Sequence, residues 1–246
     1  MSKRVALLPT CVIDTVAPDV GTATVRVLRR LGYEVTVPAD ATCCGQPAWN
    51  AGFAEQAAKV ARTTLAALDQ APADVVCVPA GSCATMMRVF WAELFELVGD
   101  HAARHRAEAL AGRVREFSEL VADHADELEG RHEATVGYHH SCHMLRELGI
   151  RAQPEALLDR VEGLERAEWD GDDRCCGFGG LFSVKQPELS IAMADDKLNS
   201  LLDSGATELV GCDQSCLMHL EGRLRSRGQT MPVRHLAEVL DEASRT

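Results

Sequence analysis

The chain has 246 residues, which is enough for one large domain or two small ones. Hydrophobic residues make up 46% and charged residues 25%, a normal globular mix, and charges interrupt every apolar stretch before it could span a bilayer. The formal net charge of −12 argues against a nucleic-acid ligand, because proteins that bind phosphate backbones usually present a basic face.

The first residues, Met1-Ser2-Lys3-Arg4, lead directly into a strand-like segment and lack the apolar core of a signal peptide. We therefore expect a cytoplasmic protein. In a reducing compartment, ten cysteines indicate metal ligands or redox centres rather than disulfides.

The first part of the chain alternates between strand-like and helix-like patterns. Short apolar runs predict strands, and apolar residues spaced three or four apart predict helices. We expect strands over residues 5–9, 33–37 and 75–79, and helices over 20–31, 54–70 and a stretch after Cys83.

The later part repeats this order. We expect strands over residues 135–138, 164–169 and 208–211, and helices through Leu145, over 154–161, over 187–203, after Cys216 and over 235–240. Between the two parts, residues 104–131 carry one apolar stripe, which predicts a connecting helix.

This pattern predicts an α/β protein made of two pseudo-repeated, Rossmann-like halves, each with a parallel sheet. The expected units are a first half over residues 1–103, a connecting helix over 104–131 and a second half over 132–246. Loops at the carboxyl ends of parallel strands are where such folds bind ligands.

Eight of the ten cysteines form two quartets built to one plan, and each member of the second follows its counterpart by 131 to 133 positions. The first quartet is Cys11, Cys43, Cys44 and Cys83, and the second is Cys142, Cys175, Cys176 and Cys216. Most of these positions follow expected strands, so each quartet should converge in space and hold metal.

The adjacent cysteines favour iron–sulfur clusters over zinc. Neighbouring side chains diverge and do not easily chelate one tetrahedral ion, and neither quartet has the C-x-x-C knuckle that is common in structural zinc sites. Gly45 and Gly177 would permit close backbone approach and offer amides to cluster sulfurs. Helices after Cys83 and Cys216 would direct their positive ends at an anionic centre.

Two cysteines stand outside the quartets. Cys77 lies within an apolar run and is expected to be a small buried residue, and Cys212, four residues before Cys216, is also more consistent with a structural role.

Specific motifs are dispersed over nearly the whole chain. They are Thr42-Cys43-Cys44-Gly45-Gln46-Pro47-Ala48, Gly81-Ser82-Cys83-Ala84, Ser141-Cys142-His143, Leu145-Arg146-Glu147-Leu148-Gly149, Cys175-Cys176-Gly177-Phe178-Gly179-Gly180, Phe182-Ser183-Val184-Lys185 and Cys216-Leu217-Met218. With these motifs the chain resembles the cysteine-rich CCG domain of heterodisulfide reductases and glycolate oxidase iron–sulfur proteins, and more closely the lactate utilization protein A family.

The resemblance implies an iron–sulfur redox subunit of a complex that oxidises L-lactate to pyruvate. It implies two protein partners, a ferredoxin-like iron–sulfur protein and a third small subunit. We expect one cluster in each half, and a site of four thiolates could hold a [4Fe–4S] cluster or leave one iron open to substrate. The heterodisulfide reductase version adds a fifth cysteine to each quartet, but Ala80 and Asp213 stand at those positions here. Asp213 could supply an oxygen ligand or cap the end of a strand.

Three further residues are candidates for catalysis. His143 or His219 could accept the proton of a hydroxyl group, and Arg146 could bind a carboxylate. For the histidines we favour the ordinary alternative, which is hydrogen bonding to a neighbouring ligand or a surface position. Two other hypotheses stay open: a zinc-stabilised interaction module of the same complex without a redox role, and a thiol–disulfide enzyme that uses the vicinal cysteines.

Overall fold

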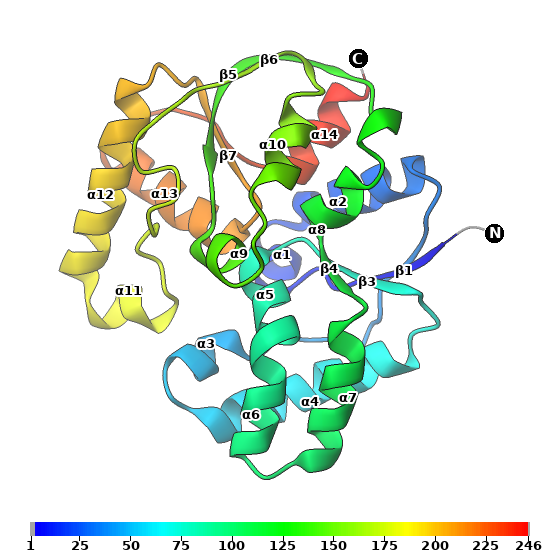
Figure 1. Cartoon of the computed structure of the whole chain (residues 1–246). Coiled ribbons are helices and arrows are strands. Elements are labelled where there is room, and N and C mark those ends of the chain that lie inside the picture. Colours follow the sequence, from blue (N-terminus) through cyan, green and yellow to red (C-terminus); the bar gives the residue numbers. More distant parts are fainter. Residues whose placement is uncertain (1–2, 246) are drawn as a thin grey trace.

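Two four-stranded parallel sheets with the same strand order form the framework of the computed structural model, which describes residues 3–245 (Figure 1). We expected no signal peptide partly from Met1 and Ser2, and these two residues lie outside the described part of the chain. The first sheet has the order β2-β1-β3-β4, from β1 (Arg4–Leu7), β2 (Glu34–Thr36), β3 (Val75–Val78) and β4 (Val114–Glu116). The second has the order β6-β5-β7-β8, from β5 (Arg131–His139), β6 (Glu162–Arg166), β7 (Glu208–Gly211) and β8 (Val233–His235).

The helices connect these strands in repeated βα units. In the first half they are α1 (Cys11–Val16), α2 (Pro18–Arg30), α3 (Gln46–Asn50), α4 (Ala54–Gln70), α5 (Gly81–Thr85), the π-helical η1 (Met86–Phe90), α6 (Trp91–Leu97), α7 (His101–Ala111), α8 (Phe117–Ala122) and the 3₁₀ turn η2 (Ala125–Glu127). In the second half they are α9 (Cys142–Arg146), α10 (Ala152–Leu158), α11 (Leu181–Lys185), α12 (Pro187–Asp203), α13 (Gln214–Ser226) and α14 (Leu236–Ala243).

The expected fold class is confirmed: the protein is α/β, with two pseudo-repeated parallel-sheet halves. The expected helices over 54–70 and 187–203 and the strand over 208–211 are confirmed at both ends. The short elements α1, α3, α11, β4 and β8 are additions that the sequence patterns did not predict.

The single connecting helix expected over residues 104–131 is wrong. The chain there forms the end of α7, strand β4, α8 and η2, and β4 pairs with β3, so the first sheet continues to Glu116. The apolar stripe wrongly suggested one continuous helix. Val114 and Phe117 are both buried, but Val114 belongs to strand β4 and Phe117 to the helix after it, α8. A parallel strand needs burial on both faces, and a three-residue strand is too short to show its own period.

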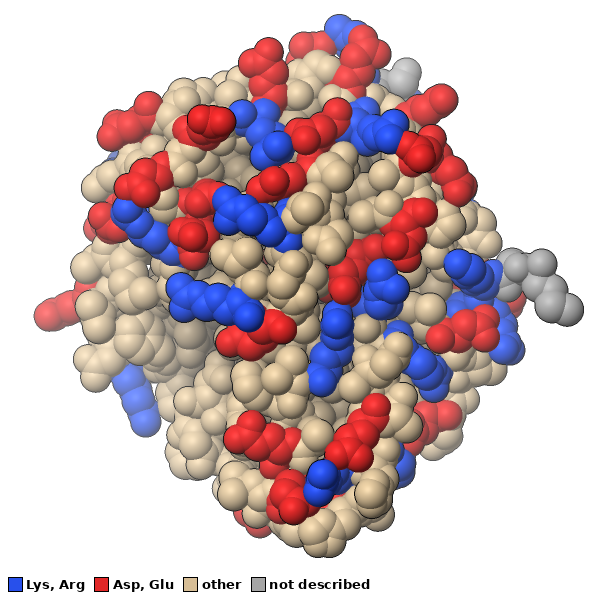
Figure 2. Space-filling view, viewed as in Figure 1, with Lys and Arg blue, Asp and Glu red and all other residues tan. Residues whose placement is uncertain are grey.

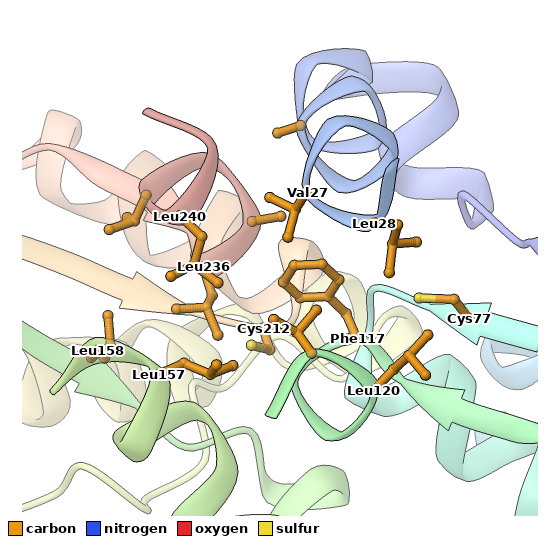
Figure 3. Packing of buried hydrophobic residues seen from close by; sticks show 14 of the residues in the cluster. Val27, Leu28, Cys77, Phe117, Leu120, Leu157, Leu158, Cys212, Leu236 and Leu240 are labelled. Carbon is orange, nitrogen blue, oxygen red and sulfur yellow. The ribbon is translucent and has the colours of Figure 1, made fainter. Parts of the chain in front are cut away.

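Alternation along the strands sends side chains into separate cores. In β1 and the residue after it, Val5 and Leu7 pack into the core shared by both halves, whereas Ala6 and Leu8 face the outer helices of the first half. The shared core lies between the sheets and contains the pairs α2 with α14 and α8 with α10, each of which joins one half to the other (Figure 3).

Phe117 of α8 lies in the middle of that shared core, between α2 residues and the start of α14 (Figure 3). Cys77 and Cys212 are fully buried within it, as expected for structural cysteines, and burial raises the pKa of both thiols. The two halves therefore share one hydrophobic core and are not independent units.

The surface carries charges of both signs. On the face shown in Figure 2, lysines and arginines are interspersed with acidic residues and gather into no extended basic patch. Within residues 3–245, no helix has the length and apolar character needed to cross a membrane.

Glu116, at the end of β4, is a fully buried carboxyl group in the shared core. Its Oε2 accepts two hydrogen bonds from Ser118, one from the backbone N–H at 2.7 Å and one from the hydroxyl group. Its Oε1 is buried without a partner among the described residues. Burial raises the pKa of Glu116 from 4.5 to about 8, against the lowering effect of the Ser118 hydrogen bonds.

We predict that Glu116→Gln stabilises the protein more at pH 8 than at pH 5. Between pH 4.5 and about 8 the unfolded chain loses the Glu116 proton while the folded chain keeps it, so stability falls as pH rises through this window. The amide stays neutral and still offers an acceptor to Ser118. The unfolding free energy of the variant relative to the wild type should rise by about 3 kcal/mol from pH 5 to pH 8. Denaturant unfolding at both pH values measures it, and an equal difference at both would contradict it.

Candidate metal centre

The first cysteine quartet comes together at the carboxyl ends of the strands in the first sheet. Cys11 begins α1, Cys43 and Cys44 lie in the loop between β2 and α3, and Cys83 lies in the first turn of α5. The sulfur atoms of Cys11 and Cys43 are 3.5 Å apart, and those of Cys44 and Cys83 are 3.3 Å apart. Cys43 and Cys44 also contact each other, so the four thiols form one continuous group.

The second quartet has the same arrangement in the other half. Cys142 begins α9, Cys175 and Cys176 lie in the loop between β6 and α11, and Cys216 lies in the first turn of α13. The sulfur atoms of Cys176 and Cys216 are 3.0 Å apart, Cys142 contacts Cys175, and Cys175 contacts Cys176.

Both quartets line the same cavity of about 210 Å³. The halves meet here because α5 packs on α9 and α1 packs on α13, and in Figure 1 α1, α5 and α9 lie together near the middle of the molecule. The approach is close: a Cβ on Gly81 would lie 2.6 Å from Cβ of Met144, and the Thr85 hydroxyl donates to the His143 carbonyl at 3.2 Å. The structure thus offers eight thiols to one enclosed space.

Backbone amides donate to sulfurs that line the cavity, and Lys197, which lies outside the lining, places a positive charge near Cys176 and Cys216. Among the described residues that line the cavity there is no lysine or arginine. Four helices begin at or just before a quartet cysteine, so partially positive N-termini face the sulfurs. Amide groups also donate directly, from Gly45 to Cys43 at 3.5 Å and from Gly177 to Cys175 at 3.4 Å.

One thiol in each quartet is strongly acidified by its neighbours. Hydrogen bonds from Cys11 and Cys44 lower the pKa of Cys43 to about 3, and hydrogen bonds from Cys142 and Cys176 lower the pKa of Cys175 to about 2. The same contacts raise the pKa of Cys11 and Cys142. The contacts within each quartet therefore favour the thiolate at Cys43 and Cys175, and the thiolate is the form of cysteine that binds metal.

The glycine after each cysteine pair has a backbone conformation that other residues adopt with strain. Gly45 has φ +88° and Gly177 has φ +87°. A Cβ on Gly45 would lie 2.7 Å from the Ala57 carbonyl oxygen of α4, and one on Gly177 would lie 2.6 Å from the Ser190 carbonyl oxygen of α12. The close approach is thus to a helix backbone, while the glycine amide serves the cysteine sulfur.

Side chains at equivalent positions of α4 and α12 form hydrogen bonds to the backbone of the two loops that carry the adjacent cysteines. Thr64 of α4 accepts a hydrogen bond from the Thr42 backbone at 3.1 Å and donates to the Cys43 carbonyl at 2.9 Å. At the same position of α12, Lys197 donates to the carbonyls of Gly171, Asp172 and Arg174. The loop between β6 and Cys175 has eight residues, whereas the loop between β2 and Cys43 has six. A longer side chain at position 197 is therefore needed to reach the carbonyl groups of the longer loop.

Neither loop support was predicted from the sequence, because a threonine or lysine in a helix has no distinctive signal. The first loop is also held by Trp91, whose indole donates to the Cys44 carbonyl at 2.8 Å. Trp91 directly follows the π-helical segment η1, and such a wide turn is frequent near functional sites.

Asp213 contacts both halves of the molecule. It is the N-cap of α13, where its Oδ1 accepts from the Ser215 backbone at 3.3 Å. Its Oδ2 accepts from the Ser82 backbone of α5 at 2.8 Å. The N-cap of α5, Ala80, has no side-chain acceptor of its own, so one carboxylate caps a helix in each half. Both oxygens are engaged, which favours the capping interpretation over a metal ligand.

The three catalytic candidates are not brought together. His143 lines the cavity, whereas Arg146 is exposed on α9 and lies outside its lining. His219 also lies outside the lining, next to Ser190 at 3.3 Å and Phe178, and burial lowers its pKa. Of these three candidates, only His143 is placed to contact a ligand inside the cavity.

A different histidine approaches the second quartet. His139, the last residue of β5, is fully buried, and one ring nitrogen and the sulfurs of Cys176 and Cys216 all lie within 4.8 Å of one another. Neither ring nitrogen has a hydrogen-bond partner of normal geometry among the described residues. Burial lowers the pKa of His139, so the ring is neutral. The sequence placed His139 beside Cys142, but only the strand geometry shows that it faces Cys176 and Cys216.

Comparison with known proteins agrees with this geometry. The chain matches the cysteine-rich (CCG) domain family over residues 5–88 and again over 136–221, and each match contains one complete quartet. It is 45% identical over 241 residues to the lactate utilization protein A of an Exiguobacterium species, with 97% of each chain covered. The chain belongs to the lactate utilization protein A family.

Other members of the family align over nearly their full length. The lactate utilization protein A of Halalkalibacterium halodurans is 40% identical, with 99% of this chain and 98% of that protein covered. Among solved structures, a hypothetical protein from Helicobacter pylori superposes with a TM-score of 0.68 at 13% identity. That match covers 98% of this chain and 49% of the other, and it shows a shared fold.

We predict that Gly45→Ala in this family member is more damaging than Gly52→Ala, since Gly52 has a similar φ of +82° but open space around it. Gly52→Ala should cost about 1–2 kcal/mol for the left-handed conformation alone. Gly45→Ala adds a methyl group that collides with the Ala57 carbonyl, so it should cost more and release bound metal. Denaturant unfolding and metal content measure both effects, and equal losses in the two variants would contradict the role of close approach.

We predict that Asp213→Ala lowers stability more than Asp100→Ala. Asp100 caps α7 within the first half, where its carboxylate accepts from the Ala103 backbone at 3.0 Å and from the Arg62 side chain at 2.6 Å, and it is the control because it caps one helix only. Loss of one cap costs about 1 kcal/mol, and Asp213 serves two helices at a buried position, so its loss should cost about 2–4 kcal/mol. Comparison of the two unfolding free energies tests this, and a similar cost for both variants would show that the contact with Ser82 is unimportant.

Proposed function

We propose that the chain is an iron–sulfur redox subunit of a system that oxidises L-lactate to pyruvate, with one cluster, of the [4Fe–4S] type, held by each cysteine quartet. The observation that supports this most directly is that both quartets face a single cavity. The lactate role rests on relatives that share up to 45% identity over nearly the whole chain and are named lactate utilization protein A.

The donor set present suits such a group, because each quartet supplies four thiols to the cavity. The first cluster would be held by Cys11, Cys43, Cys44 and Cys83, and the second by Cys142, Cys175, Cys176 and Cys216. An iron–sulfur cluster bound there would supply one-electron transfer. The amides of Gly45 and Gly177 donate to cysteine sulfurs, and hydrogen bonds of this kind are one of the ways proteins tune such centres.

The lining of the cavity favours electron transfer over lactate binding at this place. A carboxylate substrate is usually held by arginine or lysine, and neither occurs among the described residues of the lining. Arg146, the candidate for this task, is exposed outside it. We therefore assign lactate oxidation to the assembled complex, in which this chain would act with a ferredoxin-like iron–sulfur protein and a third small subunit.

The competing function, a zinc-stabilised module of the same complex, is decided by metal analysis. Sulfur separations of 3.0 to 3.5 Å within the quartets are close to the roughly 3.8 Å between thiolates around one tetrahedral zinc ion. The adjacent cysteines are the feature that favours a multi-iron centre, because they can serve two different metal atoms.

We predict that the chain purified without oxygen contains iron and acid-labile sulfide, and that Cys43→Ser and Cys175→Ser each remove about half of both. The halves carry one quartet each, so the double variant should be free of iron. Cys77→Ala is the matched control, because Cys77 is buried in the shared core away from the cavity and its loss should leave the iron content unchanged.

Stoichiometric zinc without iron would refute the redox function. For the lactate role, L-lactate should bleach the visible absorption of the clusters only when both partner proteins are present. If lactate has no effect even with the full set of partners, the iron–sulfur assignment stands but the lactate role does not.

A further inference from the structure

The two quartets have the same plan, but their surroundings differ at one position that faces the sulfurs. Cys142 follows Cys11 by 131 positions, and the same step back from His139 leads to Leu8. The strand register agrees, because Leu7 pairs with Cys77 in the first sheet as Tyr138 pairs with Val210 in the second. Leu8 and His139 thus occupy equivalent sites at the ends of the central strands.

Leu8 has an ordinary role in the first half. It is 1% exposed and packs in the same outer core as Cys44 and Cys83. An apolar side chain there needs no partner. The first quartet is therefore closed on this side by hydrocarbon.

His139 puts a polar ring in the equivalent place. Its exposure is 0%, and neither nitrogen makes a hydrogen bond of normal geometry within the described part of the chain, although the Asp172 carbonyl interacts with the ring. A buried polar group without a partner costs about 1–3 kcal/mol, and native structures contain few of them. The carbonyl can serve one ring nitrogen, so the other calls for a ligand that the protein chain itself does not supply.

The surroundings of the ring are those of a metal-binding histidine. One nitrogen lies within 4.8 Å of the sulfurs of Cys176 and Cys216, which are 3.0 Å from each other. The Asp172 carbonyl lies beside the ring, and Lys197 and the His140 backbone, at 3.2 and 2.9 Å, hold this carbonyl in place. Histidine ligands usually direct one nitrogen to the metal and the other to a carbonyl or carboxylate.

We propose that His139 is a nitrogen ligand to the metal centre of the second quartet, which makes that site a five-donor site of four cysteines and one histidine, while the first site has four cysteines only. The proposal rests on the proposed function for the presence of iron. It gives His139 a role that the sequence patterns did not predict.

The test uses full-length protein purified without oxygen, in which histidine alone is labelled with ¹⁵N. Iron and sulfide are counted first, and the reduced clusters are then examined by pulsed electron paramagnetic resonance. The wild type should show the strong nitrogen coupling of a directly bound imidazole, with the isotope shift expected for ¹⁵N. His139→Leu, which copies the first site, should lose this coupling.

Two further variants guard against unrelated effects. His132→Leu changes a histidine at the opposite end of β5, where His132 pairs with Glu208 at 3.1 Å, and should keep the coupling. His139→Cys supplies a different ligand at the same place and should keep the iron while it loses the nitrogen signal. It also covers the case in which His139→Leu fails to fold.

The outcomes separate this inference from the proposed function. Wild-type protein with clusters but without strong coupling to histidine nitrogen would overturn the ligand role of His139 and leave the redox function standing. Coupling that persists in His139→Cys would do the same. A chain without iron would refute both.

Discussion

The carboxylate of Asp213 lies where the two halves meet and accepts hydrogen bonds from the first turns of two helices, α13 in its own half and α5 in the other. These turns carry Cys216 and Cys83, so one side chain sets the positions of a cysteine in each quartet. The contact is reinforced nearby, where the Gly81 backbone donates to the Cys212 carbonyl at 3.2 Å and His235 contacts the Pro79 carbonyl at 3.1 Å. These contacts between the halves keep the two quartets facing one cavity.

The equivalence of the halves explains why buried polar contacts are tolerated where the halves meet. Buried backbone groups at helix N-termini must be satisfied, and Ala80 cannot satisfy those of α5. Asp213 can do so because the pseudo-symmetric arrangement brings both N-termini to one place. Ala80 and Asp213 stand at equivalent positions of the two halves, and only the Asp213 carboxylate makes the contact that links them.

Much of this organisation could be predicted from the sequence, and the exceptions have a common cause. Cysteine spacing identified both quartets, and long helices such as α4 and α12 were predicted to the residue, because repeated spacing and helical period extend over many positions. β4 was missed because three residues show no period. The capping of α5 by Asp213 and the approach of His139 to Cys216 depend on contacts between segments far apart in the chain, which no local pattern encodes.

The reciprocal pairing of helices across the halves has a consequence for the two sites. Helices α2 with α14 and α8 with α10 pair as the same surfaces of two identical subunits do in a twofold dimer. In a dimer of identical chains, both sites would carry the same residues. A single chain that contains both halves can instead differ at equivalent positions, as it does at Leu8 and His139 and at Ala80 and Asp213.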